Sequence, residues 1–282
     1  MSGKSENIIE LKHISKVYSD NGFKAVDDFN LEVKRGEFVT FLGPSGCGKT
    51  TTLRMIAGFE MPTSGEILLN GEDISQLPAN KRPINTVFQR YALFPHMNIY
   101  DNIAFGLKLK KLPKEEIRKK VKRVLDIVDL EGFENRKIST LSGGQQQRIA
   151  IARALVKQPE IIMADEPTGA LDSNTGRQVF ETLKNLSKDK LVIVVSHDRE
   201  FAEQFGDRII ELADGNVIDD VTRKVGYEKQ GEEINNGISF ENDTMTIKSG
   251  YHLTEEDRER INQYIDGIGT DLKAVIKKAD RG

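Results

Sequence analysis

The sequence predicts an α/β fold, and three observations lead to it. Residues 38–42 form a short apolar run rich in β-branched and aromatic side chains, which reads as a buried strand leading into a glycine-rich loop. Residues 161–164 and 191–195 are continuous apolar runs, typical of parallel strands covered on both faces. Segments with helical spacing separate these runs, and strands that alternate with helices favour an α/β architecture.

Composition excludes several classes of protein. Of 282 residues, 38% are hydrophobic and 30% charged, as in a globular protein, and the net charge of -3 gives no reason to expect a nucleic-acid partner. Cys47 is the one cysteine, which rules out an internal disulfide and agrees with a reducing cytosol. The polar start is unlike a signal peptide, and no apolar run approaches the roughly 20 residues of a membrane helix. We therefore expect a cytosolic chain that reaches a membrane only through a partner.

The first segment of the chain predicts a small antiparallel sheet ahead of the glycine-rich loop. Ile8–Leu11 and Phe29–Val33 are short pieces in which apolar and polar residues alternate. Tyr18 lies between these two predicted strands. Its ring is either a platform that stacks on an adenine base or an ordinary turn tyrosine, and the pattern leaves both readings open.

Residues 41–51 carry the most informative motif, the phosphate-binding loop G-x-x-x-x-G-K-[ST]. The loop follows a strand and precedes a predicted helix over 50–57, so its backbone N–H groups and the helix N-terminus converge on one anion. This context disfavours a chance match in a glycine turn. Lys49 would contact the β- and γ-phosphates, and the Thr50 hydroxyl would bind magnesium. We expect a nucleoside triphosphate to be bound by Gly43, Pro44, Ser45, Gly46, Cys47, Gly48, Lys49, Thr50 and Thr51.

Two further strands follow the predicted helix. Residues 66–71 read as a strand closed by a turn, and residues 84–89 as a strand with a polar residue at its end. Gln89 would contact the magnesium ion or the attacking water, or it simply ends the strand; the pattern alone favours the second reading.

From about residue 90 to 157 the sequence predicts a helical insert. Pro113 is expected at the first position of a helix with acids in its first turn. One apolar face follows at spacings of three and four, formed by Ile117, Val121, Val124, Leu125 and Val128. The lysines and arginines between them are most simply a solvated face, and contact with anionic lipid is the alternative.

A second anion site is predicted in the same insert. Ser142 is a good helix cap, and the glycines after it expose backbone N–H groups at the start of a helix that runs to Leu155. The segment that would bind the anion is Ser142, Gly143, Gly144 and Gln145. It lies more than ninety residues after Lys49.

The apolar strand over 161–164 ends in Asp165 and Glu166, the arrangement of a Walker B strand. Asp165 would hold magnesium, and Glu166 would orient and deprotonate a water for attack on the γ-phosphate. His197 follows the strand over 191–195, at the edge where open α/β sheets bind ligands. Although a lone histidine is usually structural, this one shares an edge with Lys49 and Glu166.

Residues 208–282 predict hairpins, a linker and a small appendage. Residues 208–222 predict a hairpin with an Asp-Gly turn. The polar stretch 228–236 predicts a linker, residues 238–240 and 245–247 a second hairpin, and Thr254 the cap of a helix. This part of the chain has few apolar residues and can bury little core of its own. We therefore expect residues 226–282 to form a linker and a small appendage of unknown function.

Taken together, these motifs resemble the nucleotide-binding subunit of ABC transporters over roughly residues 8–222. The order of phosphate loop, Leu-Ser-Gly-Gly-Gln signature, Walker B acids and histidine is highly specific. The residues that carry it are Tyr18, the phosphate loop, Gln89, Leu141–Gln145, Asp165–Glu166, Gly169–Asp172 and His197.

The resemblance implies a P-loop NTPase fold, with a RecA-like core, an antiparallel β subdomain and the helical insert, in a nucleotide-binding domain over 8–225. It implies ATP and Mg²⁺ as cofactors, with magnesium held by Thr50, Gln89 and Asp165. It also implies a head-to-tail dimer with each ATP between Lys49 of one subunit and Ser142–Gly144 of the other. Tyr18 then stacks on adenine, Gln89 links to the permease, Asp172 contacts the other subunit and His197 senses the γ-phosphate.

Within this family the sequence looks like a mosaic. From the phosphate loop to about Lys120 it resembles spermidine/putrescine importer ATPases, and from Ala164 to Asp220 the lipoprotein-release and antimicrobial-peptide exporter branch. The surface around Gln89 and the helical insert selects the partner, and it lies in the importer-like half. We therefore expect an ATPase on the cytoplasmic face of the membrane that energises polyamine import through permease subunits.

Three alternatives remain open. An exporter ATPase is the nearest. A soluble ABC ATPase that acts on ribosomes or DNA is less favoured, because such proteins carry tandem cassettes or a long coiled coil. A binding module that uses ATP only to hold a dimer together is disfavoured by the presence of Glu166, Gln89 and His197.

Overall fold

The computed structural model describes residues 7–18, 22–89 and 91–222, together with two short strands over 238–241 and 244–247. The chain divides after Thr222 into two compact units, which are described separately. None of the helices in the described ranges is both long and apolar enough to cross a membrane.

The centre of the first unit is a six-stranded sheet with strand order β10-β9-β3-β8-β7-β6. Five of these strands are parallel, and β10 pairs antiparallel with β9 at one edge. The strands are β3 (Phe38–Leu42), β6 (Ile84–Phe88), β7 (Ile161–Asp165), β8 (Leu191–Val195), β9 (Arg208–Ala213) and β10 (Asn216–Thr222). The predicted parallel strands and the Asp-Gly hairpin are therefore confirmed.

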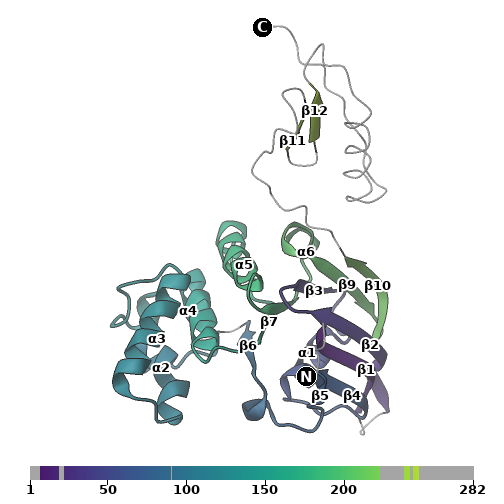
Figure 1. Ribbon diagram of the computed structural model, residues 1–282, viewed down its shortest axis with the longest axis horizontal. Coiled ribbons are helices and arrows are strands. Elements are labelled where there is room, and N and C mark those ends of the chain that lie inside the picture. Colours follow the sequence, from purple (N-terminus) through teal and green to yellow (C-terminus); the bar gives the residue numbers. More distant parts are fainter. Residues whose placement is uncertain (1–6, 19–21, 90, 223–237, 242–243, 248–282) are drawn as a thin grey trace, which may run out of the picture. The chain divides into compact units, whose positions relative to one another are not determined.

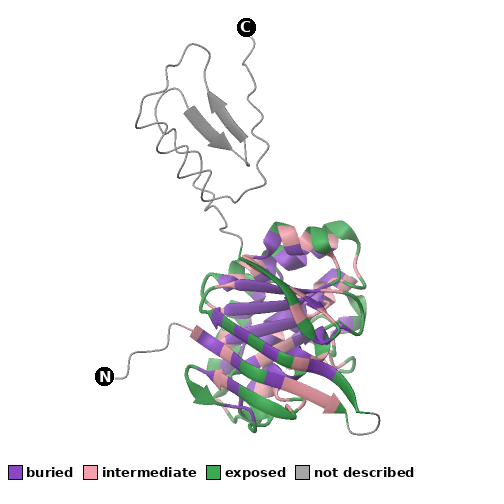
Figure 2. Cartoon of the chain, turned by 90° about the vertical axis from the view of Figure 1, so that its right-hand side faces the viewer, coloured by how far each residue is buried: buried purple, intermediate pink, exposed green. Residues whose placement is uncertain are grey.

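Successive residues of the central strands enter two different cores, as the period-two geometry of a strand requires. Phe38, Val192 and Val194 pack in one core with the insert helices and α5 (Ser173–Ser187). Val39 and Ile193 pack in the other with α1 (Lys49–Ala57) and the antiparallel sheet. This burial on both faces, visible as continuous purple strands in Figure 2, explains why the sequence shows no alternation there.

A second sheet is antiparallel, in the order β2-β1-β4-β5. Its strands are β1 (Asn7–Tyr18), β2 (Phe23–Lys34), β4 (Ser64–Leu69) and β5 (Glu72–Asp73). The strands β1 and β2 are much longer than predicted, because bulges interrupt the register and break the alternation that marks a strand in sequence. The expectation that Tyr18 lies between strands is wrong, since it is the last residue of β1 and pairs with Phe23.

The helical insert consists of α2 (Ile99–Leu109), α3 (Lys114–Ile127) and α4 (Gly143–Leu155), seen together on one side of Figure 1. Every predicted core position of α3 is buried, and the intervening basic residues are exposed or half-buried. Pro113 precedes the first turn of α3 as its cap residue rather than occupying it. Short 3-10 helices over Ala79–Lys81 and Ile138–Thr140 and the helix α6 (Arg199–Phe205) complete the unit.

The second unit contributes one described feature, the antiparallel pair β11 (Ile238–Glu241) and β12 (Thr244–Ile247). This pair confirms the predicted hairpin. The expected linker over 228–236 and the helix expected from Thr254 lie outside the described residues.

Candidate functional site

The phosphate-binding loop joins β3 to α1 at the carboxyl edge of the parallel sheet. Gly43 has a φ of 148°, and a Cβ built there would overlap the Leu212 carbonyl oxygen. Gly48 caps α1 with a φ of 101°. Both positions require glycine, because residues with an L side chain rarely adopt this backbone conformation and their Cβ would collide with nearby backbone of the same chain.

Lys49 is buried within the loop that precedes it. Its Nζ donates hydrogen bonds to the carbonyl oxygens of Gly43 at 2.6 Å and Pro44 at 2.8 Å. Its side chain therefore folds back over the loop, with the ammonium group among the backbone atoms of the segment predicted to bind phosphates. Ser45, Gly46 and Thr50 are exposed at the same loop and helix start, whereas Cys47 is buried.

Asp165, the last residue of β7, meets the first turn of α1. Thr50 Oγ1 donates a hydrogen bond to Asp165 Oδ1 at 3.1 Å. Burial raises the pKa of Asp165, the Thr50 hydrogen bond opposes that rise, and the Glu166 carboxylate adds to it. A hydroxyl and a half-buried carboxylate side by side are hard oxygen donors of the kind that bind Mg²⁺.

The next residue, Glu166, lies between two polar side chains from other strands. Its Oε2 accepts a hydrogen bond from Gln89 Nε2 at 3.4 Å, and its Oε1 lies 3.4 Å from His197 Nδ1. Gln89 directly follows β6, and His197 follows β8. The parallel strands β6, β7 and β8 are neighbours, so their carboxyl ends bring together three side chains that are far apart in sequence.

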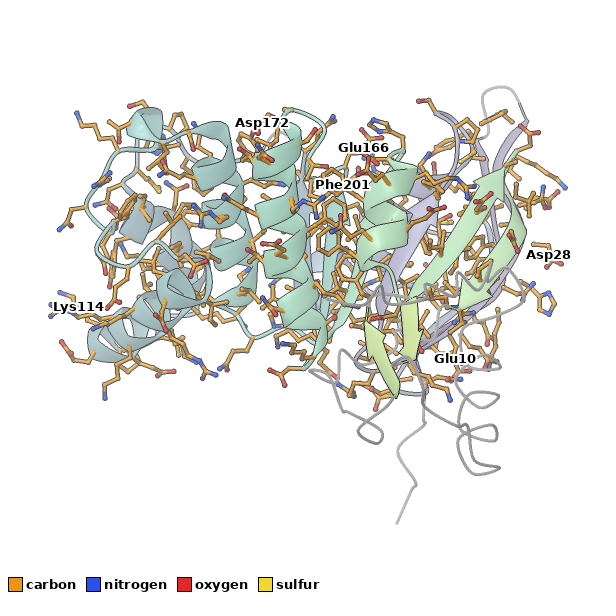
Figure 3. The ribbon with its side chains drawn as sticks, turned by 90° about the horizontal axis from the view of Figure 1, so that it is seen from above. Glu10, Asp28, Lys114, Glu166, Asp172 and Phe201 are labelled. Carbon is orange, nitrogen blue, oxygen red and sulfur yellow. The ribbon has the colours of Figure 1, made fainter. Side chains whose placement is uncertain are left out.

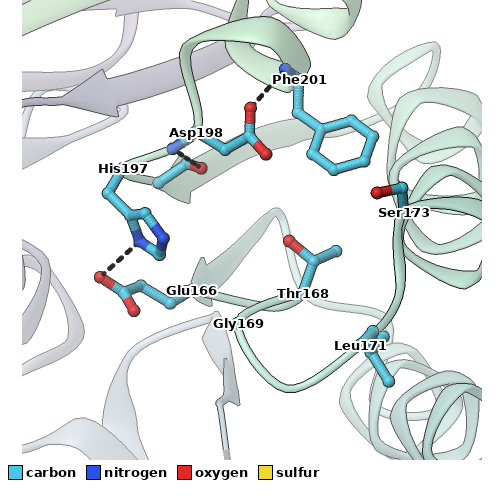
Figure 4. A pocket seen from close by; sticks show the side chains of 9 residues that line it. Glu166, Thr168, Gly169, Leu171, Ser173, His197, Asp198 and Phe201 are labelled. Carbon is cyan, nitrogen blue, oxygen red and sulfur yellow. Dashed lines mark hydrogen bonds and ion pairs between the residues drawn. The ribbon is translucent and has the colours of Figure 1, made fainter.

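A cavity of about 190 Å³ lies beside Glu166 and His197 (Figure 4). Thr168, Ser173, Asp198 and Phe201 are among the residues that line it. Sequence reasoning did not single out these four for the site. The available signal was their position within one to seven residues of Glu166 or His197, which does not identify which side chains point inward.

The signature segment stands at the start of α4. Ser142 Oγ accepts from the Gln145 backbone N–H at 3.3 Å, and Gln145 Oε1 accepts from the Ser142 N–H at 3.1 Å, which together form a capping box. Gly144 is buried, and a Cβ there would overlap Thr175 Cγ2. Gly143 is half-buried.

The structure does not bring the two predicted anion sites together within one chain. Figure 1 shows α4 on the side of the insert, away from α1. Among the described residues, no hydrogen bond or ion pair joins Ser142–Gln145 to the phosphate-binding loop.

Asp172 and Tyr18 complete the predicted set. Asp172 is exposed and caps α5 by accepting from the Thr175 N–H at 3.0 Å. Hydrogen bonding with the Thr175 side chain, and then with its backbone, lowers the pKa of Asp172. Figure 3 places Asp172 and Glu166 along the same edge of the unit. Tyr18 is 37% exposed, and Lys16 Nζ lies 5.2 Å from the centre of its ring.

Comparison with known proteins yields a consistent result. Residues 26–169 match the protein family described as ABC transporter. A spermidine/putrescine import ATP-binding protein, PotA, of Clostridium novyi is 53% identical over 215 residues, covering 76% of this chain and 61% of that protein. The PotA protein of Mannheimia succiniciproducens is 45% identical over 271 residues, covering 95% of this chain and 71% of that one. The chain thus spans about three fifths of the length of the Clostridium novyi relative.

Solved structures agree with the sequence comparison. A dimeric structure of the ATP-binding cassette MJ0796, in a post-hydrolysis state with ADP and Pi, superposes with a TM-score of 0.68. It is 40% identical and covers 76% of this chain and 98% of its own. The structure of cbiO1 from Clostridium perfringens, part of the ABC transporter complex cbiONQ, has a TM-score of 0.72 and 30% identity, and the match covers 77% of this chain and 89% of that one.

Proposed function

The chain belongs to the ABC transporter family, and from this premise we propose that it binds and hydrolyses ATP to energise polyamine import. We place the nucleotide-binding domain at residues 8–225 and a linker with a small appendage at 226–282. The domain would sit on the cytoplasmic face of the membrane, held there by permease subunits.

The observation that best supports ATP hydrolysis is the convergence of five side chains beside the phosphate-binding loop. Thr50, Gln89, Asp165, Glu166 and His197 are linked by three contacts of 3.1–3.4 Å. They come from four segments of the chain, so no local packing requirement explains why they meet. A hydroxyl, a metal-binding acid, a base and two groups that orient the base form the set that phosphoryl transfer to water requires.

In the proposed reaction, residues 43–51 bind the ATP phosphates, Lys49 contacts the β- and γ-phosphates, and Tyr18 stacks on adenine. Thr50, Asp165 and Gln89 would hold Mg²⁺, which neutralises phosphate charge. Glu166 accepts the proton of a water whose oxygen attacks the γ-phosphorus, and the bond to the ADP oxygen breaks. His197 and Gln89 hold the Glu166 carboxylate in place from either side.

The separation of the two anion sites supports a shared-site dimer. In a head-to-tail pair, Ser142, Gly143, Gly144 and Gln145 of one subunit would cover the ATP held by Lys49 of the other. Asp172, at the same edge as Glu166, would lie at this interface. The similarity to a cassette solved as a dimer with ADP and Pi supports the same arrangement.

Polyamine import is the transport function that the relatives support. The 215-residue match to a spermidine/putrescine import protein is longer than the importer-like segment ending near Lys120, so the likeness extends into the second half of the domain.

Glu166→Gln tests the chemical role. This variant keeps a hydrogen-bonding side chain but removes the base, so turnover should fall about a hundredfold or more while ATP binding persists. The ATP-bound dimer should accumulate on size exclusion with ATP and magnesium. Glu181→Gln, an exposed change on α5, is the matched control. A Glu166→Gln protein that stays monomeric under these conditions would overturn the shared-site model.

Lys49→Ala tests the phosphate site. Losing a charged donor to phosphate should weaken ATP binding about tenfold or more. Titration with a fluorescent ATP analogue measures this, with the exposed Lys188→Ala as control. Unchanged affinity would mean that the loop does not bind the phosphates.

A further inference from the structure

Gln147 connects the signature helix to the backbone beside Glu166. It lies on α4, is completely buried, and donates from Nε2 to the Pro167 carbonyl oxygen at 2.8 Å. Pro167 is the residue immediately after Glu166. Across the described residues, this is the one side-chain hydrogen bond to the backbone of residues 166–168.

The backbone that receives this bond is strained. Glu166 has a φ of 46°, in the left-handed region that non-glycine residues rarely occupy. Its N–H donates to the Val195 carbonyl at 3.0 Å, and its own carbonyl accepts from the Gly169 N–H at 3.2 Å. Such a conformation persists only where the surroundings hold it, and the Gln147 amide is part of those surroundings.

Packing alone does not account for a glutamine at this position. Gln147 Oε1 is buried and accepts no hydrogen bond from the described residues. A half-satisfied buried amide destabilises a fold relative to an apolar side chain of similar size. Departures of this kind from good packing concentrate at functional sites.

Gln147 lies on the same helix as the signature segment, so the two move together. The capping box fixes Ser142 and Gln145 at the start of the helix, and Gln147 lies two residues, less than one turn, after Gln145. Figure 1 shows α4 beside β6, whose end carries Gln89, and α4 packs against that strand. A displacement of the signature segment that moves α4 as a rigid body therefore also moves the donor to Pro167.

We propose that Gln147 is a positioning residue that couples the two ATP sites of the dimer. In the proposed head-to-tail dimer, on which this inference rests, the signature segment contacts the ATP of the other subunit. When the signature segment contacts that ATP, the position of α4 is fixed. The Gln147 amide then holds the Pro167 carbonyl, and Glu166 of the same subunit takes its catalytic position. Occupancy of one site is thereby transmitted to the base of the other.

Gln147→Met tests this inference, because it keeps the volume and removes the donor. We expect kcat to fall about tenfold to a hundredfold, since small misplacement of a catalytic group has effects of this size. The KM for ATP should change little, and the Hill coefficient for ATP should drop to 1 from a higher parent value. ATP-dependent dimerisation of the Glu166→Gln/Gln147→Met protein should match that of Glu166→Gln.

Asn85→Leu is the matched control. Asn85 Nδ2 donates to the Ala154 carbonyl at 2.6 Å, so it is also an amide bonded to a backbone carbonyl, but at the far end of α4. This variant should lose stability without losing kcat or cooperativity. Equal losses of kcat in both variants would reduce Gln147 to a packing role and overturn the proposal.

Gln147→Glu adds a pH readout, measured as kcat over the pH range in which the variant stays folded. A protonated carboxyl donates its O–H to the Pro167 carbonyl, whereas an ionised one cannot. The activity of this variant relative to the parent should therefore rise as the pH falls. A flat ratio, or a Gln147→Met enzyme with parental kcat and Hill coefficient, overturns the inference. A parent without ATPase activity would instead contradict the proposed function itself.

Discussion

At the scale of single residues, the site contains groups whose environment serves chemistry at the expense of stability. Asp165 is the clearest example, because burial raises its pKa even though the proposed metal site requires its ionised form. The left-handed backbone of Glu166, with a φ of 46°, is a second feature that lowers the stability of the fold.

Asp165→Asn should therefore stabilise the protein at neutral pH without magnesium. A raised pKa means that the folded state holds the proton more tightly than the unfolded chain, so stability is greatest below the unfolded pKa of about 3.9 and is lost as the pH rises through the folded value. Asparagine imitates the neutral form. Urea unfolding measured from acid to neutral pH should show that the free energy of unfolding of the variant, relative to that of the parent, increases as the pH rises. A variant less stable than the parent at pH 7 would contradict this reading.

Residue roles divide into those that a local motif predicts and those that depend on the fold. The loop over 43–51 and the Ser142 cap follow from adjacent residues, so the sequence predicts their geometry well. The meeting of Gln89, Glu166 and His197 depends on the order of β6, β7 and β8, which no local pattern encodes. Gln147 escapes sequence reasoning altogether, because a glutamine beside two others on a helix carries no sign of burial.

At the scale of elements, glycine lets the signature helix approach α5. Gly144 lies against Thr175, near the start of α5, with no space for a Cβ. This close approach brings the signature segment next to the start of α5. The residues between Glu166 and α5 end at Asp172, which caps that helix.

Gly144→Ala should destabilise the protein by about 1–3 kcal/mol, because the new methyl group overpacks a filled space. Thr175→Ser removes the opposing methyl, so the double variant should recover most of that loss. Denaturant unfolding of the four proteins forms a double-mutant cycle. Additive effects would show that the two side chains do not meet.

Element boundaries were predicted best where a strand is buried on both faces. The strands β3, β7 and β8 are short and almost entirely apolar, with Thr40 and Asp165 as the exceptions, so their bounds are clear in sequence. Strand β1 was predicted as four residues and spans twelve. His13 has a φ of 53°, and the register shifts around it move apolar side chains out of the expected phase.

At the scale of the whole molecule, the first unit contains the complete set of proposed ATP-site residues. The chain divides after Thr222, close to the boundary expected from composition. The sequence predicted a mainly parallel sheet but not its strand order, because pairing between distant strands is decided by the packing of the whole unit.

Removing residues 226–282 should leave ATPase activity and the melting temperature of the first unit near their parent values, since a domain with its own core folds alone. Calorimetry and a steady-state ATPase assay measure both. Aggregation or loss of the thermal transition would show that the second unit contributes to folding.

The central claim is that each ATP site is completed by two subunits, and cross-linking tests it most directly. Cys47→Ser removes the one cysteine, and Ser45→Cys with Ser142→Cys then places thiols in the phosphate-binding loop and the signature segment. Both serines are exposed. Ser64→Cys, also exposed, replaces Ser142→Cys in the control.

With a short thiol-reactive cross-linker in the Glu166→Gln background, the account predicts a covalent dimer that forms only with ATP and magnesium. The Ser64→Cys control should stay at the mass of one chain. A cross-link within one chain, or no ATP-dependent cross-link at all, would contradict the shared site.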